Sequence, residues 1–218
     1  MKTIHILVAD DHELVRVGIK AVVSQCADWR VCGEASNGRE AVELALRFKP
    51  EVAVLDIGMP ELNGLDAARQ IRQACPATEV LILTMLDSED LVRKALAAGV
   101  RGFIFKTDTS RLLVAAIEAL AQHKPFFTSA VAEALLARHL NPDQAAQAEA
   151  AKSFRLTARE TEIVQLLAEA KTSKETAVRL GVSVKTVEAH RANIMRKLNL
   201  HSIAELVRYA VRNQIIQP

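Results

Sequence analysis

Short apolar runs alternate along the first half of the chain with longer segments that are apolar on one side only. The runs have the length and the β-forming content of buried strands and lie at 4–9, 31–35, 52–55, 80–83 and 102–105. The segments between them repeat apolar residues with the helical period and predict helices at 12–24, 38–48, 64–74, 88–98 and 110–122. Strands that alternate regularly with helices are typical of βαβ units. We therefore expect residues 1–123 to form an α/β domain with a five-stranded, doubly wound parallel sheet.

The second half of the chain shows only helical patterns. An amphipathic segment at 128–140 follows a Pro-bounded turn, and the stretch after it lacks large apolar residues, so 124–153 is predicted to be a linker with one helix. Residues 154–218 are expected to form a small all-helical domain, with helices at 157–168, 174–180, 184–198 and 202–213.

Composition sets limits on the class of protein. Half of the 218 residues are apolar and a quarter are charged, as in ordinary globular proteins. Residues 154–218 hold 11 basic and 6 acidic residues, whereas the rest of the chain holds 17 and 20. A small basic domain attached to an acidic one suits a nucleic-acid reader. No secretory or membrane-spanning run and no CxxC pair occur, which predicts a cytoplasmic protein with buried thiols and no membrane partner.

Polar residues stand at the ends of four predicted strands. They are Asp10 and Asp11, Asp56, Thr84, and Lys106. Sites in doubly wound sheets lie beyond the carboxyl ends of the strands, so these residues should converge. Three carboxylates would repel one another without a hard cation, and their oxygens suit Mg²⁺. A carboxylate nucleophile, a metal, a lysine and a hydroxyl together indicate phosphoryl transfer onto aspartate.

Each of these residues also has a plainer interpretation. Asp11 suits a helix N-cap, Thr84 a turn and Lys106 a solvated loop, and only their joint occurrence favours a site. A flavin-phosphate site would need backbone and hydroxyl donors where "ADDHE" presents negative charge. An aspartate-dependent phosphatase would place a general acid two residues after Asp56, where the chain has Gly58.

The helical domain has the pattern of a helix-turn-helix. Gly181 ends one short helix, and Ser183 is well placed to cap the basic helix at 184–198. In this motif the second helix enters the major groove. A helical wheel places Val187, Ile194 and Leu198 on the core side and predicts a groove surface on the opposite side.

That surface supplies the candidate DNA contacts. Glu188 suits a cytosine amino group and Arg196 a guanine or a phosphate, whereas Arg191 falls toward the buried flank and reaches phosphate past a packed stem. The complete predicted set is Ser183, Lys185, Thr186, Glu188, Ala189, Arg191, Ala192, Asn193 and Arg196. For each charged residue the plainer interpretation is a solvated helix face.

Residues 3–123 resemble the receiver domain of two-component response regulators. The resemblance rests on "VADDHELVRVGI", "VLDIGMPELNGLDAARQIR", "ILTM" and "AAGVRGFIFK". It implies a flavodoxin-like fold in which Asp56 accepts phosphate from a sensor histidine kinase. It further implies Mg²⁺ bound by Asp10, Asp11, Asp56 and the Gly58 carbonyl, phosphoryl contacts from Thr84 and Lys106, and a switch formed by Thr84 and Phe103.

Residues 156–215 resemble the LuxR-type DNA-binding domain, notably in "LTARE", "SKETA" and "GVSVKTVEAHRANIMRKL". Together the two resemblances point to response regulators of the NarL/FixJ type. They imply a phosphorylation-controlled transcription factor that is not an enzyme, forms a homodimer on activation and binds double-stranded promoter DNA, with RNA polymerase as a further partner. Two rival hypotheses remain: a phosphotransfer enzyme or phosphatase, and a constitutive DNA-binding protein in which the first domain only assembles dimers.

Overall fold

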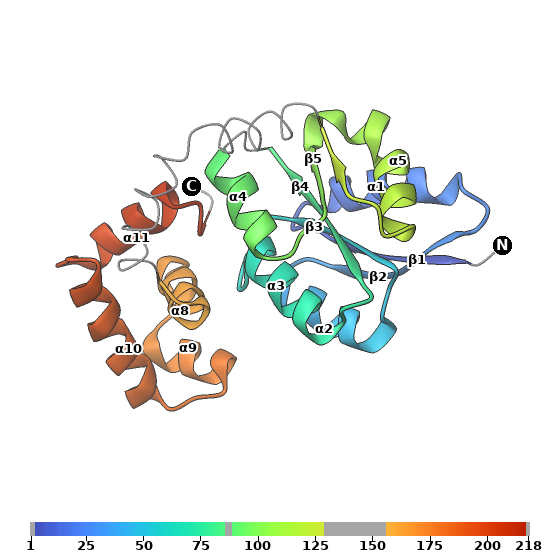
Figure 1. Ribbon diagram of the computed structural model, residues 1–218. Coiled ribbons are helices and arrows are strands. Elements are labelled where there is room, and N and C mark those ends of the chain that lie inside the picture. Colours follow the sequence, from blue (N-terminus) through green and yellow to red (C-terminus); the bar gives the residue numbers. More distant parts are fainter. Residues whose placement is uncertain (1–2, 86–88, 129–155, 217–218) are drawn as a thin grey trace. The chain divides into compact units, whose positions relative to one another are not determined.

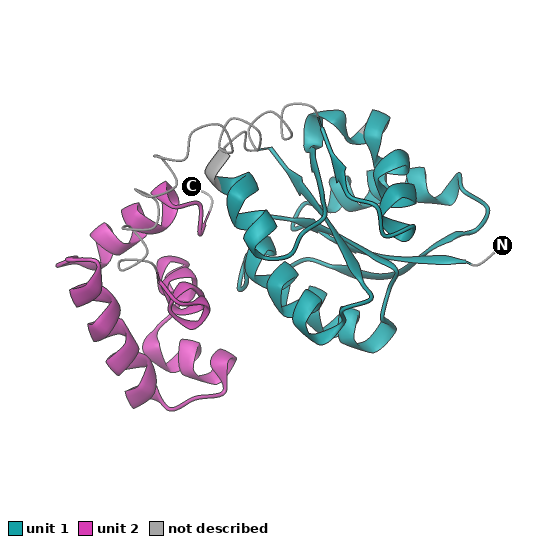
Figure 2. Ribbon diagram, viewed as in Figure 1, with its two compact units in different colours: residues 1–137 teal, residues 138–218 magenta. Residues whose placement is uncertain are grey.

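The computed structural model describes residues 3–85, 89–128 and 156–216 (Figure 1). The chain divides into two compact units, residues 1–137 and 138–218 (Figure 2). This division falls inside the predicted linker at 124–153. Residues 129–140 of the predicted linker helix lie outside the described part of the chain, so that helix and the three domain boundaries stay predictions. No helix among the described residues is long and apolar enough to cross a membrane.

Strands and helices alternate through the first unit as the apolar pattern predicts. The strands are β1 (Ile4–Ala9), β2 (Trp29–Ala35), β3 (Val52–Asp56), β4 (Glu79–Thr84), β5 (Gly102–Phe105) and β6 (Phe126–Phe127). The helices are α1 (Glu13–Ser24), α2 (Gly38–Phe48), α3 (Gly64–Ala74), α4 (Glu89–Ala97) and α5 (Thr109–Ala121), with a short 3₁₀ turn at Lys106–Asp108. The strands form one sheet in the order β2-β1-β3-β4-β5-β6, and every neighbouring pair is parallel.

The sheet has six strands, so the prediction of five was wrong. The extra strand is two residues long and pairs Phe126 with Gly102 and Phe127 with Phe103. Its first backbone amide donates to the Arg101 carbonyl at 2.8 Å. Pro125 keeps this segment out of a helix, and the two partly buried phenyl rings hold it against the edge of β5.

Alternate residues of each central strand face two separate cores. In β1, for example, Leu7 packs into the cluster beneath α2, α3 and α4, whereas Ile6 packs into the cluster beneath α1 and α5. This arrangement is the expected consequence of a side-chain period of two in a sheet covered on both faces (Figure 1).

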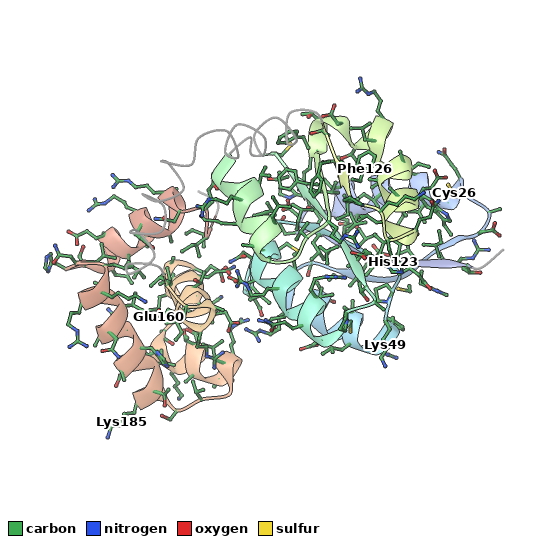
Figure 3. The ribbon with its side chains drawn as sticks, in the orientation of Figure 1. Cys26, Lys49, His123, Phe126, Glu160 and Lys185 are labelled. Carbon is green, nitrogen blue, oxygen red and sulfur yellow. The ribbon has the colours of Figure 1, made fainter. Side chains whose placement is uncertain are left out.

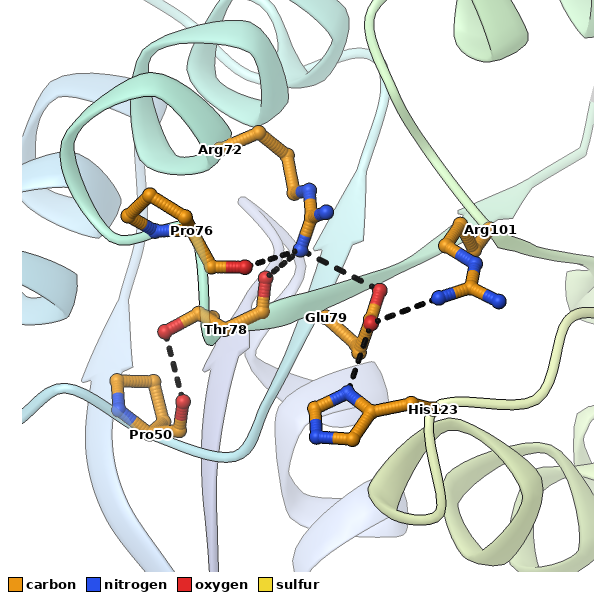
Figure 4. A network of polar contacts seen from close by, with 7 residues as sticks. All are labelled: Pro50, Arg72, Pro76, Thr78, Glu79, Arg101 and His123. Carbon is orange, nitrogen blue, oxygen red and sulfur yellow. Dashed lines mark hydrogen bonds and ion pairs between the residues drawn. The ribbon is translucent and has the colours of Figure 1, made fainter.

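A buried carboxylate closes the amino-terminal edge of the sheet. Glu79, at the start of β4, keeps 3% of its side chain exposed and pairs with Arg101 at 3.2 Å, Arg72 at 3.4 Å and His123 at 3.0 Å (Figure 4). Arg72 also donates to the Thr78 carbonyl at 2.7 Å. Because these partners come from α3, the lead into β5 and the end of α5, the network ties the helical layers to the sheet at the edge opposite the predicted site.

The described part of the second unit, residues 156–216, contains four helices: α8 (Ala158–Ala168), α9 (Ser173–Leu180), α10 (Val184–Lys197) and α11 (Ile203–Arg212). Capping boxes begin two of them, Thr157 with Glu160 at α8 and Thr172 with Glu175 at α9. All four helices contribute to one apolar cluster. Its fully buried members include Ile163, Ile194 and Leu206. The predicted helices agree with these to within one residue at each end.

Candidate functional site

Two aspartates lie buried at the carboxyl edge of the sheet. Asp10 follows β1 and Asp56 ends β3, and they are 0% and 1% exposed. The adjacent parallel strands place them side by side, because Ala9 pairs with Leu55 in the register. Asp11 is exposed.

Two glycines allow the surrounding loops to approach this edge. A Cβ atom on Gly64 would lie 1.9 Å from the Asp56 carbonyl oxygen, and one on Gly38 would lie 1.9 Å from the Leu62 carbonyl oxygen. Both glycines are the first residues of helices, and their helices are capped by Asn63 and Asn37. The close fit at Gly64 places the start of α3 against the end of β3, and the close fit at Gly38 places the start of α2 against the loop that precedes α3.

Lys106 brings a cation between the two buried carboxylates. Its ammonium lies 2.7 Å from Oδ2 of Asp10 and 3.1 Å from Oδ1 of Asp56, and 11% of the side chain is exposed. Burial alone would lower the pKa of Lys106, but the hydrogen bond to Asp10 and the two negative charges raise it above its ordinary value. The lysine therefore stays protonated and acts as a fixed positive charge.

The cost of burying the charged Asp56 carboxyl exceeds the stabilisation that Lys106 gives it, so the pKa of Asp56 is raised. Burial raises its pKa and Asp10 adds to this effect, whereas the charge and the hydrogen bond of Lys106 oppose it. The Oδ2 atom of Asp56 is buried and has no hydrogen-bond partner among the described residues. A buried oxygen of this kind is costly unless a cation or a donor arrives.

The donor set fits a divalent cation. Ligand atoms of Asp10, Asp11, His12 and Asp56 all lie within 4.8 Å of one another. Carboxylate oxygens are the ligands that Mg²⁺ prefers, and Asp56 keeps one buried oxygen without a hydrogen-bond partner among the described residues. Gly58 lies two residues beyond Asp56 in the turn, and its carbonyl as a metal ligand stays a prediction.

Sequence reasoning missed His12. Its Nδ1 atom lies 2.7 Å from Asp11 and 3.2 Å from Asp10, and its backbone amide donates to Asp10 at 2.9 Å. The signal available in the sequence was a histidine directly after the aspartate pair. Only the turn geometry shows that the ring folds back onto them.

The two predicted switch residues occupy neighbouring strands. Thr84 is 1% exposed at the end of β4, one residue beyond the partner of Asp56 in the register. Phe103 is fully buried in β5 and meets Phe105 edge to face, with ring centroids 5.8 Å apart. Their roles in phosphoryl contact and switching stay predictions.

The helix-turn-helix geometry of the second unit follows from local capping. Gly181 ends α9 in the left-handed conformation with a φ of 63°. Ser183 caps α10 by accepting from the Thr186 amide at 3.0 Å. Val187 and Ile194 are fully buried and fix which side of α10 faces the core.

The opposite side of α10 is open to solvent. All nine predicted contact residues are exposed: Ser183, Lys185, Thr186, Glu188, Ala189, Arg191, Ala192, Asn193 and Arg196. Arg191, expected on the buried flank with its guanidinium reaching outward, lies four residues after Val187 and three before Ile194 and is exposed, so its contact with phosphate stays a prediction. Lys185 projects from the amino-terminal end of the helix (Figure 3). A recognition helix enters the major groove by this end, where its side chains meet both phosphates and base edges.

Each of the two units matches a known protein family. Residues 6–118 match the response regulator receiver domain, and residues 155–210 match the bacterial regulatory proteins of the luxR family. The chain belongs to the response regulators. A receiver joined to a LuxR-type DNA-binding domain makes this response regulator a phosphorylation-dependent transcription regulator of the NarL/FixJ type.

The similar proteins cover between 64% and 97% of this response regulator. Oxygen regulatory protein NreC of Staphylococcus epidermidis (strain ATCC 12228) is 36% identical over 215 residues, covering 97% of this chain and 99% of its own. A two-component response regulator of the LuxR family from Aurantimonas sp. SI85-9A1 has a crystal structure that is 30% identical, with a TM-score of 0.60, and covers 64% of this chain and 99% of its own. RcsB from Salmonella enterica serovar Typhimurium, solved bound to promoter rprA with the phosphomimetic BeF3⁻, is 22% identical with a TM-score of 0.61 over 95% of this chain and 98% of its own, which shows a common fold.

Proposed function

We propose that Asp56 is the phosphoacceptor of this response regulator and that its phosphorylation controls dimerisation and promoter binding. The observation that carries the proposal is the Lys106 ammonium, which lies within 3.1 Å of Asp56 and also contacts Asp10. A nucleophilic carboxylate needs positive charge beside it when a phosphoryl group arrives, and this charge is already in place.

The chemistry is a single displacement at phosphorus. An oxygen of Asp56 forms a bond to the phosphorus as the bond to the donor atom breaks, and the donor keeps the electron pair. The donor is a phosphohistidine of a sensor kinase, and its nitrogen leaves as an imidazole. Lys106 binds an oxygen of the transferred group, and Thr84 donates its hydroxyl to another.

Asp10, Asp11, Asp56 and the Gly58 carbonyl would hold Mg²⁺. The ion supplies positive charge that offsets the charge of the acidic group and of the phosphoryl oxygens. The buried, unpartnered oxygen of Asp56 supports this assignment. Because no general acid stands at Gly58, the phosphoryl group is retained as a signal, and we infer a regulator rather than an enzyme.

The second unit binds DNA in response to phosphorylation of the first. Phosphorylation reorders Thr84 and Phe103 and favours a homodimer whose α10 helices enter the major groove of promoter DNA. The nine exposed residues of the α10 face contact the duplex. Structures of RcsB dimers bound to DNA are known, and they support dimeric DNA binding by the present response regulator. The protein then acts in the cytoplasm, with a sensor histidine kinase, promoter DNA and RNA polymerase as its partners.

The test uses the full chain with Mg²⁺ and either beryllofluoride or a small phosphodonor. With the phosphodonor the intact mass should rise by one phosphoryl group, and with either reagent the dimer fraction in analytical ultracentrifugation should increase. Asp56→Asn should respond in neither assay, whereas the matched control Asp28→Asn, at an exposed position, should respond as the parent does. Phosphate retained by Asp56→Asn, or continuous release of phosphate with turnover, would overturn the proposal.

A further inference from the structure

The side chain of His12 belongs to the acidic site by position. Its Nδ1 atom lies 2.7 Å from Oδ1 of Asp11 and 3.2 Å from Oδ1 of Asp10. The residue stands at the N-cap of α1 but makes no side-chain cap hydrogen bond. Its backbone amide donates to Asp10 at 2.9 Å, so the main chain holds the ring over the carboxylates.

Lys106 divides the oxygens of the site into two groups. It takes Oδ2 of Asp10 and Oδ1 of Asp56. Oδ2 of Asp56 is buried and has no hydrogen-bond partner in the described part of the chain. Oδ2 of Asp56 and Oδ1 of Asp10, which these lysine contacts do not involve, therefore remain for an ion, and the His12 ring lies 3.2 Å from the second of them.

The spacing of these atoms approaches that of a coordination shell. One ligand atom from each of Asp10, Asp11, His12 and Asp56 lies within 4.8 Å of the others. Two ligands on opposite sides of a first-row ion are about 4.2 Å apart, because each bond is about 2.1 Å long. Four ligand atoms this close together can bind one ion after small movements of their side chains.

An imidazole nitrogen changes which ion such a site prefers. Carboxylates alone suit Mg²⁺, whereas imidazole suits Zn²⁺ and its neighbours, and affinity rises from Mn²⁺ toward Zn²⁺ at sites of mixed oxygen and nitrogen donors. We propose that His12 is a ligand of the acidic site and that the site binds divalent first-row transition-metal ions more tightly than Mg²⁺. This inference rests on the proposed function and names the class of ion that the same site takes.

A plainer account would leave His12 as a hydrogen-bond partner of Asp11. In that account, removing the ring changes the affinity for all divalent ions by a similar factor, because only the shared carboxylates are affected. A ligand role instead predicts a loss that is confined to the ions that favour nitrogen. The ratio of affinities, rather than any single affinity, separates the two accounts.

The experiment titrates the metal-free full chain with Mg²⁺, Mn²⁺ and Zn²⁺ in a calorimeter. The parent should bind in the order Zn²⁺, Mn²⁺, Mg²⁺. Loss of an outer partner of a metal ligand costs roughly 10- to 100-fold in affinity, so His12→Ala should lose at least about 10-fold for Zn²⁺. Its Mg²⁺ affinity should change by far less. His5→Ala is the matched control, because His5 also pairs with a carboxylate, Glu51 at 3.2 Å, but outside the acidic site.

A spectroscopic measurement decides the question without a variant. With Mn²⁺ bound to the parent protein, electron–nuclear double resonance should detect a histidine nitrogen coupled to the ion. Absence of this coupling, or an equal loss for all three ions in His12→Ala, overturns the inference. If either result occurs while Mg²⁺ and beryllofluoride still drive dimerisation through Asp56, the proposed function stands. Loss of that Asp56-dependent response in the parent would instead sink the proposed function.

Discussion

The Lys106 ammonium lies 3.1 Å from Oδ1 of Asp56, and the two side chains are only 11% and 2% exposed. The same ammonium contacts Asp10, so two buried carboxylates share one cation. Without a metal ion the buried cluster therefore carries an excess negative charge. Burial is the main cause of the raised pKa of Asp56, and the charge of Asp10 adds to it, so the stability of the metal-free protein depends on this residue.

Asp56→Asn should stabilise the metal-free protein at neutral pH. The pKa of Asp56 is raised above 3.8, so the folded state disfavours the carboxylate relative to the unfolded chain. The stabilising contribution of the protonated form is complete below pH 3.8 and is lost as the pH rises through the folded-state value. Each unit of that shift corresponds to about 1.4 kcal/mol. Urea unfolding of both proteins in a chelating buffer across this range measures the difference.

The two unfolding curves should converge near pH 3.8 and separate above it. Added Mg²⁺ should stabilise the parent protein but not Asp56→Asn, since an ion that binds only the folded state raises the free energy of unfolding. A variant that is less stable than the parent at neutral pH in the chelating buffer would contradict the prediction.

Lys106→Met should have the opposite effect. Removing one partner of a buried ion pair leaves uncompensated charge and typically costs about 3–5 kcal/mol. The loss should be largest at high pH and should shrink as the pH falls, because protonation removes the repulsion between Asp10 and Asp56. Urea midpoints at pH 8 and pH 5 provide the test. Lys124→Met, at an exposed lysine, should be nearly neutral, and an equally small effect at Lys106 would refute the account.

Gly64→Ala should destabilise the first unit and displace the end of β3. The added methyl group would lie 1.9 Å from the Asp56 carbonyl oxygen, so backbone must move, at a cost of about 1–3 kcal/mol or more. Gly18→Ala is the contrasting change, because no atom lies within 4 Å of the new Cβ and the residue is inside α1. Gly18→Ala should raise the free energy of unfolding of the first unit by about 0.5–1 kcal/mol. Thermal unfolding of the two variants should shift in opposite directions.

The strand ends and the exposed face of α10 could be predicted from the sequence because the spacing of apolar residues reveals where strands and helices lie and which side of each is buried. Parallel strands end at one edge, which is why residues as distant in sequence as Asp10 and Lys106 meet there. Val187 and Ile194 are one helical heptad apart and define the buried side of α10. What such periods specify is the direction of side chains within regular elements.

Features outside regular elements could not be predicted in this way. The strand Phe126–Phe127 is too short to show a period of two, and its pairing depends on the edge that β5 offers. The approach of His12 to Asp11 depends on a turn whose dihedral angles leave no pattern in the sequence. The role of Gly64 depends on the position of a carbonyl in another element.

Thr176→Val should stabilise the second unit. Thr176 is fully buried in α9, and its hydroxyl has no hydrogen-bond partner among the described residues. Valine has nearly the same shape and removes the unsatisfied group, which should contribute about 1 kcal/mol. Calorimetry of the full chain should show a higher transition temperature for this unit. Thr161→Val is the control, because Thr161 donates to the Thr157 carbonyl at 3.0 Å and should gain nothing. A similar gain at both positions would show that the hydroxyl is not the cause.

Lys185→Ala should weaken DNA binding by a nearly equal factor for all sequences. Lys185 is exposed at the amino-terminal end of α10, where a lysine suits a phosphate contact. Loss of one phosphate contact should reduce the slope of log affinity against log salt concentration by about 0.9. Fluorescence anisotropy with a random-sequence duplex, at several salt concentrations and with Mg²⁺ and beryllofluoride present, measures that slope. Lys124→Ala removes the same charge from the first unit and should leave the slope unchanged. If both variants lower it equally, net charge rather than the α10 face explains the binding.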